Sequence, residues 1–334
     1  MAMALAARAL KMRAVVSHGP GSMSALRAEN IDRPSPADDG VLVRVRASSA
    51  NPVDLFALTP VAHMQRGLKA AVMGTDFAGT VEAVGKNVSD FEPGDDVFGG
   101  GRGAFAEYLA ISEQGAMARK PAGVPFDQAG AVTVAGSTAL QALRDHGRVQ
   151  RGQRVLVNGA SGGVGTFAVQ IARSFGAEVT AVCSTKHVEL VRSIGAQRVI
   201  DYTTDDFTLG GERYDLMLDV AGNRSWSECM RVLESDATYA GVGAAGIQHG
   251  KGGGWRAIGH FLQVRMGSLR GTRRVVTLFI AKLSKDDLVF LGALLASGSL
   301  KAVIDRRYDL AGVADALGYL DQGHAMGKIA IEIA

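Results

Sequence analysis

The chain has 334 residues, of which 47% are hydrophobic and 21% charged, so it is long enough to form two domains with sizeable cores. The formal net charge of +3 is small and Lys and Arg are scattered, which excludes nucleic acid as a partner, and an anionic small ligand is enough to explain it. The two cysteines give no disulfide framework or zinc-finger spacing, which indicates a cytoplasmic protein, and no apolar run is long enough for a membrane span.

The first part of the chain predicts a β-rich domain. Residues 1–11, "MAMALAARALK", lack the features of a signal peptide, and we interpret them as an extension before a strand that starts at Met12. Short alternating runs such as "GVLVRVRAS" and "FAGTVEAVG" follow, separated by Gly, Pro and Asp turns. This spacing indicates a compact, barrel-like sheet.

From Phe126 the apolar spacing becomes helical and continues to Gly147, after which strands and helices alternate. This alternation predicts an α/β fold with a doubly wound parallel sheet. Its strands are expected at Val155–Asn158, Glu178–Cys183, Arg198–Asp201, Asp215–Val220, Thr238–Val242 and Val275–Ile280.

The last part of the chain contains one irregular segment and three further elements. Residues 244–274, rich in Gly and Arg, predict a long mobile excursion that closes over the site, or alternatively a dimer or membrane-surface contact. A helix follows, with Ser284 and Asp287 at capping-box spacing and Gly298 beyond its end. The chain then closes with a strand, a helix and a strand.

A glycine-rich turn lies between the first strand and first helix of the α/β part. Ala160, Gly162 and Gly165 have G-x-G-x-x-G spacing, with Ala in the first place. Residues without large side chains let the backbone approach a pyrophosphate, whose charge is stabilised at a helix N-terminus. Because the flanking strand–helix–strand unit is present, we expect a dinucleotide site rather than a merely structural turn.

The end of the second strand of this unit predicts which dinucleotide binds. NAD-specific folds place Asp or Glu there to bind the ribose 2′-hydroxyl. This chain has Cys183, Ser184, Thr185 and Lys186 instead, and hydroxyls with a cation suit a 2′-phosphate. We therefore expect NADPH, although Ser184 could instead cap the following helix.

With these motifs, the chain resembles the zinc-free, quinone oxidoreductase-like branch of the medium-chain dehydrogenase/reductase superfamily, over Met12 to Ala334. The resemblance is carried by the glycine turn and by "SSANPVDL", "GTDFAGTVEAVG", "PGDDVFG", "GAFAEYLAI", "VAGSTALQAL", "VIDYTTDDF", "DVAGNRS" and "GHAMGKIAIEI". It implies a GroES-like catalytic domain formed by residues 12–135 and 300–334, and a Rossmann NADPH-binding domain over 136–299.

The resemblance also implies site residues. Zinc-dependent relatives carry Gly-His-Glu where this chain has Gly74, Thr75 and Asp76, so no metal site is expected. Lys328 in the "GK" of the last strand is expected at the cofactor, or alternatively in solvent. The remaining cofactor contacts implied by the family, together with those above, are Asn51, Thr138, Ser161, Gly162, Gly163, Val164, Ser184, Lys186, Tyr202, Val220, Gly241 and Val242.

The expected activity is hydride transfer from NADPH to a quinone or an α,β-unsaturated carbonyl. The segment after "NPVD" lacks the tyrosine that enoyl reductases of this superfamily use as proton donor, so Asn51 and His63 are the candidate catalytic residues, with solvent as the alternative. Asp54 is expected to be structural. The expected partners are a small-molecule substrate and a second copy of the chain in a homodimer. The alternative function is an NADPH-binding sensor or structural protein with little turnover.

Overall fold

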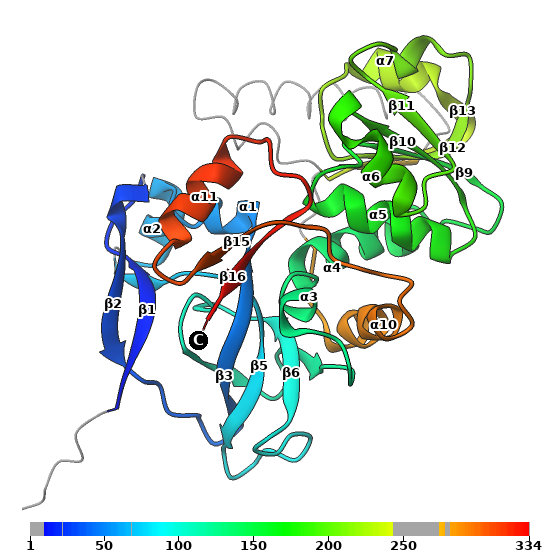
Figure 1. Cartoon of the computed structure of the whole chain (residues 1–334). Helices are drawn as coiled ribbons and strands as arrows, with labels where there is room; N and C mark the ends of the chain where they lie inside the picture. Colours follow the sequence, from blue (N-terminus) through cyan, green and yellow to red (C-terminus); the bar gives the residue numbers. More distant parts are fainter. Residues whose placement is uncertain (1–9, 22, 68, 243–273, 278–280, 334) are drawn as a thin grey trace, which may run out of the picture.

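The computed structural model describes residues 10–21, 23–67, 69–242, 274–277 and 281–333 (Figure 1). Most of the extension expected over residues 1–11, and nearly all of the excursion expected over 244–274, lie outside the described residues. The first strand already includes Lys11, which pairs with Asp32, so the extension as predicted is too long by at least this residue. No described helix has the length and apolarity to cross a membrane.

The β-rich part contains two sheets within the described chain. The smaller has the order β2-β1-β4, and the larger has the order β15-β16-β3-β5-β6-β8, with β7 also paired to β3. The strands are β1 Lys11–Ser17, β2 Leu26–Asp32, β3 Gly40–Ala50, β4 Ala71–Val72, β5 Asp76–Val84, β6 Asp96–Gly100, β7 Tyr108–Ser112, β8 Ala116–Arg119, β15 Ile304–Asp309 and β16 Lys328–Glu332. The strand from the end of the chain thus completes a sheet begun near its start.

Short helices surround these sheets. The 3-10 turn η1 spans Met23–Ala25, and the helices are α1 Pro52–Phe56, α2 Pro60–Gln65, α3 Phe126–Gly130 and α11 Val313–Asp321. The strand–helix–strand predicted at the end of the chain is confirmed by β15, α11 and β16. Leu317 and Ile331 belong to the core that this part encloses.

The single helix predicted from Phe126 to Gly147 is wrong, because the helix breaks after Gly130. The chain forms α3, then α4 (Thr133–Gln141), then the π-helical turn η2 (Ala142–His146). The Val134 N–H is taken by the side chain of Asp76 at 2.9 Å, so it does not continue the helix from Gly130. Gly130 itself lies so close to β3 that a Cβ there would be 2.9 Å from the Ala47 carbonyl oxygen.

The α/β part is a parallel sheet with the order β11-β10-β9-β12-β13-β14, which is the strand order of a Rossmann fold. Its strands are β9 Arg154–Asn158, β10 Glu178–Cys183, β11 Arg198–Asp201, β12 Tyr214–Asp219, β13 Leu233–Gly241 and β14 Arg274–Thr277. Its other elements are α5 Gly163–Ser174, η3 Thr185–His187, α6 Val188–Ser193, η4 Phe207–Leu209, α7 Trp226–Arg231 and α10 Lys285–Ala296. The predicted bounds of β10 and β11 are confirmed, whereas β13 begins earlier than predicted, at Leu233.

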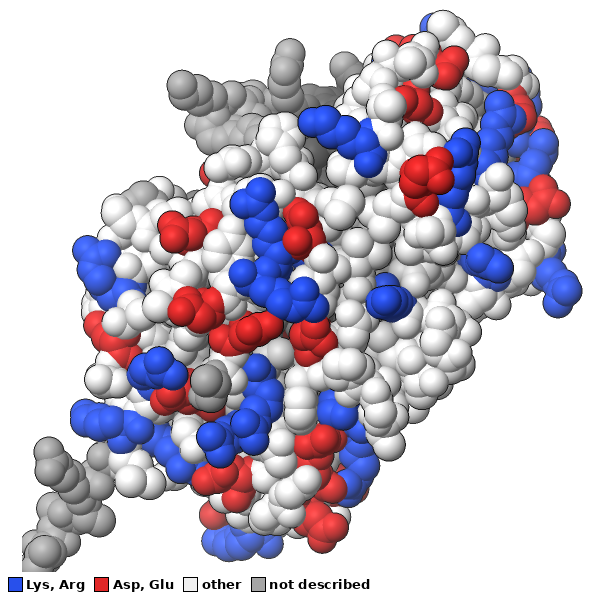
Figure 2. Space-filling view, in the orientation of Figure 1, with Lys and Arg blue, Asp and Glu red and all other residues white. Residues whose placement is uncertain are grey.

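The two parts meet along a seam in which side chains bind backbone. Gln170 accepts from the Lys301 N–H at 2.9 Å and donates to the Lys301 carbonyl at 3.0 Å. Gln128 makes the equivalent pair of bonds with Ala302, at 2.8 and 3.1 Å. These bonds fix the segment that leads from α10 back to the β-rich part. Blue and red side chains are interspersed over the face shown in Figure 2.

Candidate active site

The glycine turn connects β9 to α5 with the geometry that a dinucleotide needs. Gly159 has a φ of 86°, a conformation that favours glycine. Gly165 packs so tightly that a Cβ would be 2.1 Å from the Gly159 carbonyl oxygen, whereas a Cβ on Gly162 would meet nothing nearer than 3.6 Å. The helix therefore lies close to the strand, while Gly162 at its N-terminus has no atom close to the place of a side chain.

The residues predicted for the 2′-phosphate lie at the ends of β10 and β11. The Tyr202 N–H donates to the Cys183 carbonyl at 3.0 Å, which brings Tyr202 beside Ser184. The Tyr202 side chain is 49% exposed and Lys186 is exposed. Ser184 is at the N-cap position of η3, but its side chain makes no capping bond, so the alternative that it caps this turn is wrong.

An acidic residue also lies at this end of the sheet. Asp201 ends β11 and accepts hydrogen bonds from the Thr185 hydroxyl at 2.5 Å and from the Thr203 hydroxyl at 2.7 Å. The Thr185 hydroxyl, followed by the Thr203 N–H, holds the pKa of this carboxyl below its usual value. Asp201 is thus an ionised group with partners of its own.

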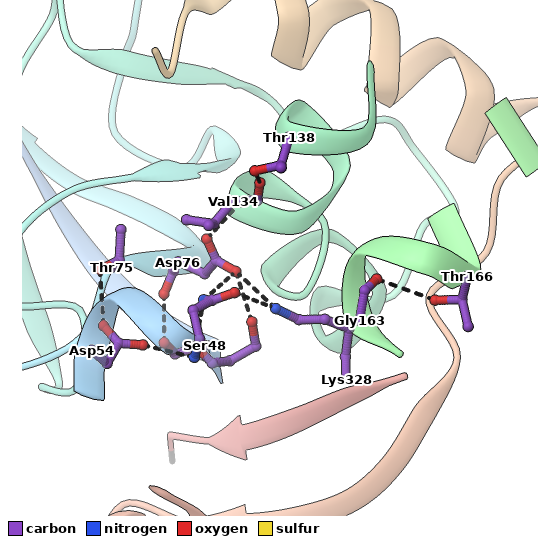
Figure 3. Close-up of polar contacts among 11 residues, drawn as sticks. Ser48, Asp54, Thr75, Asp76, Val134, Thr138, Gly163, Thr166 and Lys328 are labelled. Carbon is purple, nitrogen blue, oxygen red and sulfur yellow. Dashed lines mark hydrogen bonds and ion pairs between the residues drawn. The ribbon is translucent and has the colours of Figure 1, made fainter. Parts of the chain in front are cut away.

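A buried polar cluster lies where the β-rich part faces the glycine turn (Figure 3). At its centre the Asp76 carboxylate accepts from the Ser49 hydroxyl at 2.7 Å, the Asn51 amide at 2.9 Å and the Val134 N–H at 2.9 Å. The Lys328 ammonium lies 3.6 Å from the same carboxylate. Asp76 therefore joins β5, β3, α4 and β16 at one point. We call Ser49, Asn51, Asp76 and Lys328 the Asp76 cluster.

Lys328 connects this cluster to the glycine turn. Its ammonium donates to the Asn51 side-chain oxygen at 2.5 Å, and its side chain is so near the turn that a Cβ on Gly163 would be 3.4 Å from its Cδ. Burial lowers the pKa of Lys328, and Asp76 acts in the opposite direction. With only 3% of its surface exposed, Lys328 does not face solvent, and that alternative is wrong.

Asn51 is held from its other side by Asp54. The Asn51 N–H donates to one Asp54 oxygen at 2.8 Å, and the Thr75 hydroxyl donates to the other at 2.9 Å. Burial raises the pKa of Asp54 from 3.8 to about 7, against the effect of these two hydrogen bonds. Asp54 thus caps the first turn of α1 and fixes Asn51, which agrees with the structural role expected for it.

The remaining predicted residues come from α4, from the ends of β12 and β13, and from α2. Thr138 follows Val134 by one helical turn and donates to its carbonyl at 2.7 Å. Val220 and Val242 follow the C-terminal ends of β12 and β13, and Gly241 ends β13, at the edge of the sheet where the turn lies. His63 is buried in α2, and among the described residues its Nδ1 has no hydrogen-bond partner.

Two carboxylates are buried in this region for which the sequence predicted no role. Asp76 organises the cluster, and Asp219 accepts from the Asn158 amide at 2.8 Å and from the Tyr239 hydroxyl at 2.7 Å, where β9 and β12 adjoin. The available signal was an acid at the end of a largely apolar strand, since Asp76 begins β5 and Asp219 ends β12, and a buried acid needs partners. Among described residues, no group of three or more His, Cys, Asp or Glu could hold a metal ion.

A Rossmann sheet whose glycine turn faces a buried polar cluster from a second, β-rich part is typical of nicotinamide-dependent oxidoreductases. Comparison with known families agrees with this class. Residues 37–125 match the alcohol dehydrogenase GroES-like domain family, and residues 194–331 match the family described as zinc-binding dehydrogenase.

Comparison with individual proteins identifies the family more narrowly. It is 34% identical to a trans-enoyl reductase of Aspergillus terreus, over 88% of this chain and 86% of that protein. It is 32% identical to a chloroplastic quinone oxidoreductase of Triphysaria versicolor, over 96% and 98%. The quinone oxidoreductase structure from Coxiella burnetii superposes with a TM-score of 0.84 at 25% identity, over 97% of this chain and 100% of that one. The chain belongs to the quinone oxidoreductase-like family of medium-chain dehydrogenases/reductases.

Proposed function

We propose that the protein transfers hydride from NADPH to a quinone or an α,β-unsaturated carbonyl. The observation that carries this proposal is the position of the Asp76 cluster, buried directly beside the glycine turn. The related proteins named above are a trans-enoyl reductase and quinone oxidoreductases. When bound, NADPH supplies the hydride, and the protein supplies alignment and exclusion of water.

The residues beside the turn have distinct tasks in this proposal. Ser161 to Val164 bind the pyrophosphate, and Thr138, Val220, Gly241 and Val242 contact the nicotinamide half of the cofactor. Asn51 and Lys328 orient the nicotinamide end, because both are locked by Asp76 and have almost no freedom to move. His63 is a candidate proton donor, since its buried Nδ1 has no protein partner within the described chain.

The cofactor we propose is NADPH rather than NADH. In support, Ser184 and Lys186 directly follow β10, whose end carries no acid, and Tyr202 follows β11 beside it. Against this preference, the carboxylate of Asp201 also lies at this end of the sheet. Its oxygens already accept from Thr185 and Thr203, but a carboxylate has further lone pairs and Asp201 retains the capacity to accept from a ribose hydroxyl, so the preference for NADPH rests on Ser184, Lys186 and the missing acid at the end of β10.

The variant Ser184→Ala/Lys186→Ala tests the preference. Two charge-assisted contacts to a phosphate are worth roughly 1.5 to 3 kcal/mol each, so the KM for NADPH is expected to rise at least tenfold while that for NADH changes little. Lys86→Ala, which removes an exposed lysine of the other domain, is the matched control. An equal rise for both cofactors rules the preference out.

Turnover distinguishes the reductase from the alternative function, an NADPH-binding sensor or structural protein. Purified protein is assayed for NADPH oxidation with a panel of benzoquinones, naphthoquinones and enones. Sustained oxidation with at least one acceptor supports the reductase. Tight NADPH binding without turnover on any of them favours the sensor.

Three further properties remain proposals. Thr75 and Asp76 stand where zinc-dependent relatives carry histidine and glutamate, so activity is expected to survive prolonged chelation.

In the homodimer that we propose, β14 offers an edge for pairing, because within the described part of the chain it pairs with β13 alone. The cytoplasm remains the proposed location.

A further inference from the structure

A second hollow, distinct from the cofactor site, lies on the seam between the two domains. It has a volume of about 970 Å³ and is lined by the last turns of α5 and α6, by α10 and by the segment leading into β15. Ser174, at one end of the hollow, lies roughly 16 Å along α5 from Gly163, whereas at another wall the Val303 carbonyl accepts from the Lys328 N–H at 2.7 Å. No contact proposed for the cofactor is part of this hollow.

The charge of the hollow is of one sign. Arg173 lines it from α5, Lys301 from the segment before β15 and Arg307 from β15, and none of its lining residues is an Asp or Glu. Arg307 is partly neutralised from outside, by Asp127 at 2.7 Å and Glu332 at 3.4 Å. Within the described chain, no ion pair or side-chain hydrogen bond engages the Arg173 and Lys301 head groups.

The rest of the lining is mixed, and aliphatic side chains stand beside the polar residues Gln128, Gln170, Ser174, Ser193 and Ser299. Leu190, Ile194, Leu294 and Ile304 are half-buried there, and three of them pack against the main core of the α/β domain. Their remaining surface faces the hollow. In Figure 2, isolated blue side chains stand within a largely uncharged area of this face between the two parts. Cations together with aliphatic side chains in one hollow favour a ligand with both a charged and an apolar part.

The hollow is also preorganised. Lys301, which supplies one cation, lies in the segment that Gln170 and Gln128 bind by paired backbone hydrogen bonds. Arg173 is positioned by its contact with the turn after α6, where a Cβ on Gly195 would be 2.6 Å from its Cδ. The backbone that carries Lys301 is therefore fixed, whereas ordering the exposed head groups of Arg173 and Lys301 on a ligand costs rotamer entropy.

We propose that this hollow binds an amphiphilic anion, a carboxylate or phosphate head on an aliphatic chain, at a site separate from the cofactor and substrate. Arg173 and Lys301 bind the anionic head of the ligand, and Leu190, Ile194, Leu294 and Ile304 contact its aliphatic chain. Since the ligand contacts both domains, it connects them across the seam. The proposal does not depend on the reductase function.

Titration of the NADPH-saturated protein with laurate, below its micelle concentration, tests the proposal by calorimetry. One laurate is expected to bind per chain, and dodecanol, which lacks the charge, is expected to bind at least tenfold more weakly. Arg173→Gln/Lys301→Gln is expected to weaken laurate binding by about tenfold or more, since removing a charge-assisted hydrogen bond weakens binding by a factor of this order. Lys86→Gln, an exposed lysine outside the hollow, is the control and should bind as the wild type does.

A second variant makes the test independent of charge. Ser193→Trp places a bulky ring on the wall of the hollow and is expected to abolish laurate binding, while NADPH turnover and melting temperature stay as in the wild type. Absence of laurate binding to the wild type overturns the proposal. So does binding that survives both variants, since the laurate is then elsewhere. Binding to phosphatidylglycerol vesicles without binding of free laurate, or a change of oligomeric state in Ser193→Trp alone, also overturns it.

Discussion

At the scale of single residues, the site depends on buried charges that hold one another. Asp76 is fully buried and Lys328 is 3% exposed, with 3.6 Å between ammonium and carboxylate. Such a pair is costly to desolvate, so its hydrogen bonds to Ser49, Asn51 and Val134 are what make it tolerable. These contacts fix the Asn51 side chain, and a fixed side chain is what the alignment of a substrate or cofactor group requires.

Lys328→Met tests this pairing, because it leaves the Asp76 carboxylate buried without its cation. The free energy of unfolding is expected to fall by about 3 kcal/mol. In Lys328→Met/Asp76→Asn the uncompensated charge is gone, so the double variant should be more stable than the sum of the single effects predicts. Urea unfolding of the four proteins measures the coupling, and strictly additive effects would contradict a paired role.

Asp54 gives a pH dependence whose sign is set by its raised pKa. In the unfolded chain it ionises near 3.8, and in the folded protein near about 7. Between these values the unfolded state binds fewer protons, so the contribution of Asp54 is fully present below pH 3.8 and is lost as the pH rises through about 7.

Asp54→Asn removes this titration. Relative to the wild type, the variant is expected to gain stability as the pH rises from about 4 to about 8, by about 2 to 4 kcal/mol. Urea unfolding at a series of pH values checks this, with the exposed Asp38→Asn as control. If the difference between Asp54→Asn and wild type does not change with pH, the buried carboxyl is not neutral in the folded protein.

At the scale of elements, local patterns were predictable and long-range contacts were not. The glycine turn, β10 and β11 depend on periodicity within a few residues, and their predicted bounds agree with the structure. The break after Gly130 is caused by Asp76, which is distant in sequence, so helical spacing alone could not reveal it. The burial of Lys328 likewise follows from pairing of β16 with β3.

The packing of α5 on β9 gives an element-scale prediction with a matched control. In Gly165→Ala the new methyl group meets the Gly159 carbonyl at 2.1 Å, so the helix must move. Stability should fall by about 2 kcal/mol or more. In Gly162→Ala the nearest atom is 3.6 Å away, so stability should change by less than about 1 kcal/mol while NADPH binding weakens.

Thermal unfolding and NADPH titration by fluorescence, on both glycine variants, measure these effects. Equal destabilisation by the two substitutions would show that close packing at Gly165 is not what the turn requires. Unchanged NADPH affinity in Gly162→Ala would mean that the pyrophosphate does not approach this residue.

At the scale of the whole molecule, the proposed cofactor site belongs to both domains. The glycine turn comes from the Rossmann sheet, whereas Asn51 and Lys328 come from the β-rich domain. The Gly327 N–H donates to the Ser161 carbonyl at 2.8 Å, so the turn and the strand that carries Lys328 are bonded directly. This bond places the glycine turn and the Asp76 cluster side by side, which is the arrangement that the proposed hydride transfer requires.

The most direct test of hydride transfer is a single turnover of the protein–NADPH complex, followed by the loss of reduced-nicotinamide absorbance. The complex is mixed with a quinone or an enone, once with ordinary NADPH and once with NADPH deuterated at the transferred position. We expect the absorbance to decay in one turnover, and the decay to slow several-fold with the deuterated cofactor. A complex that keeps its absorbance with every acceptor, although NADPH is demonstrably bound, would contradict the proposed reductase.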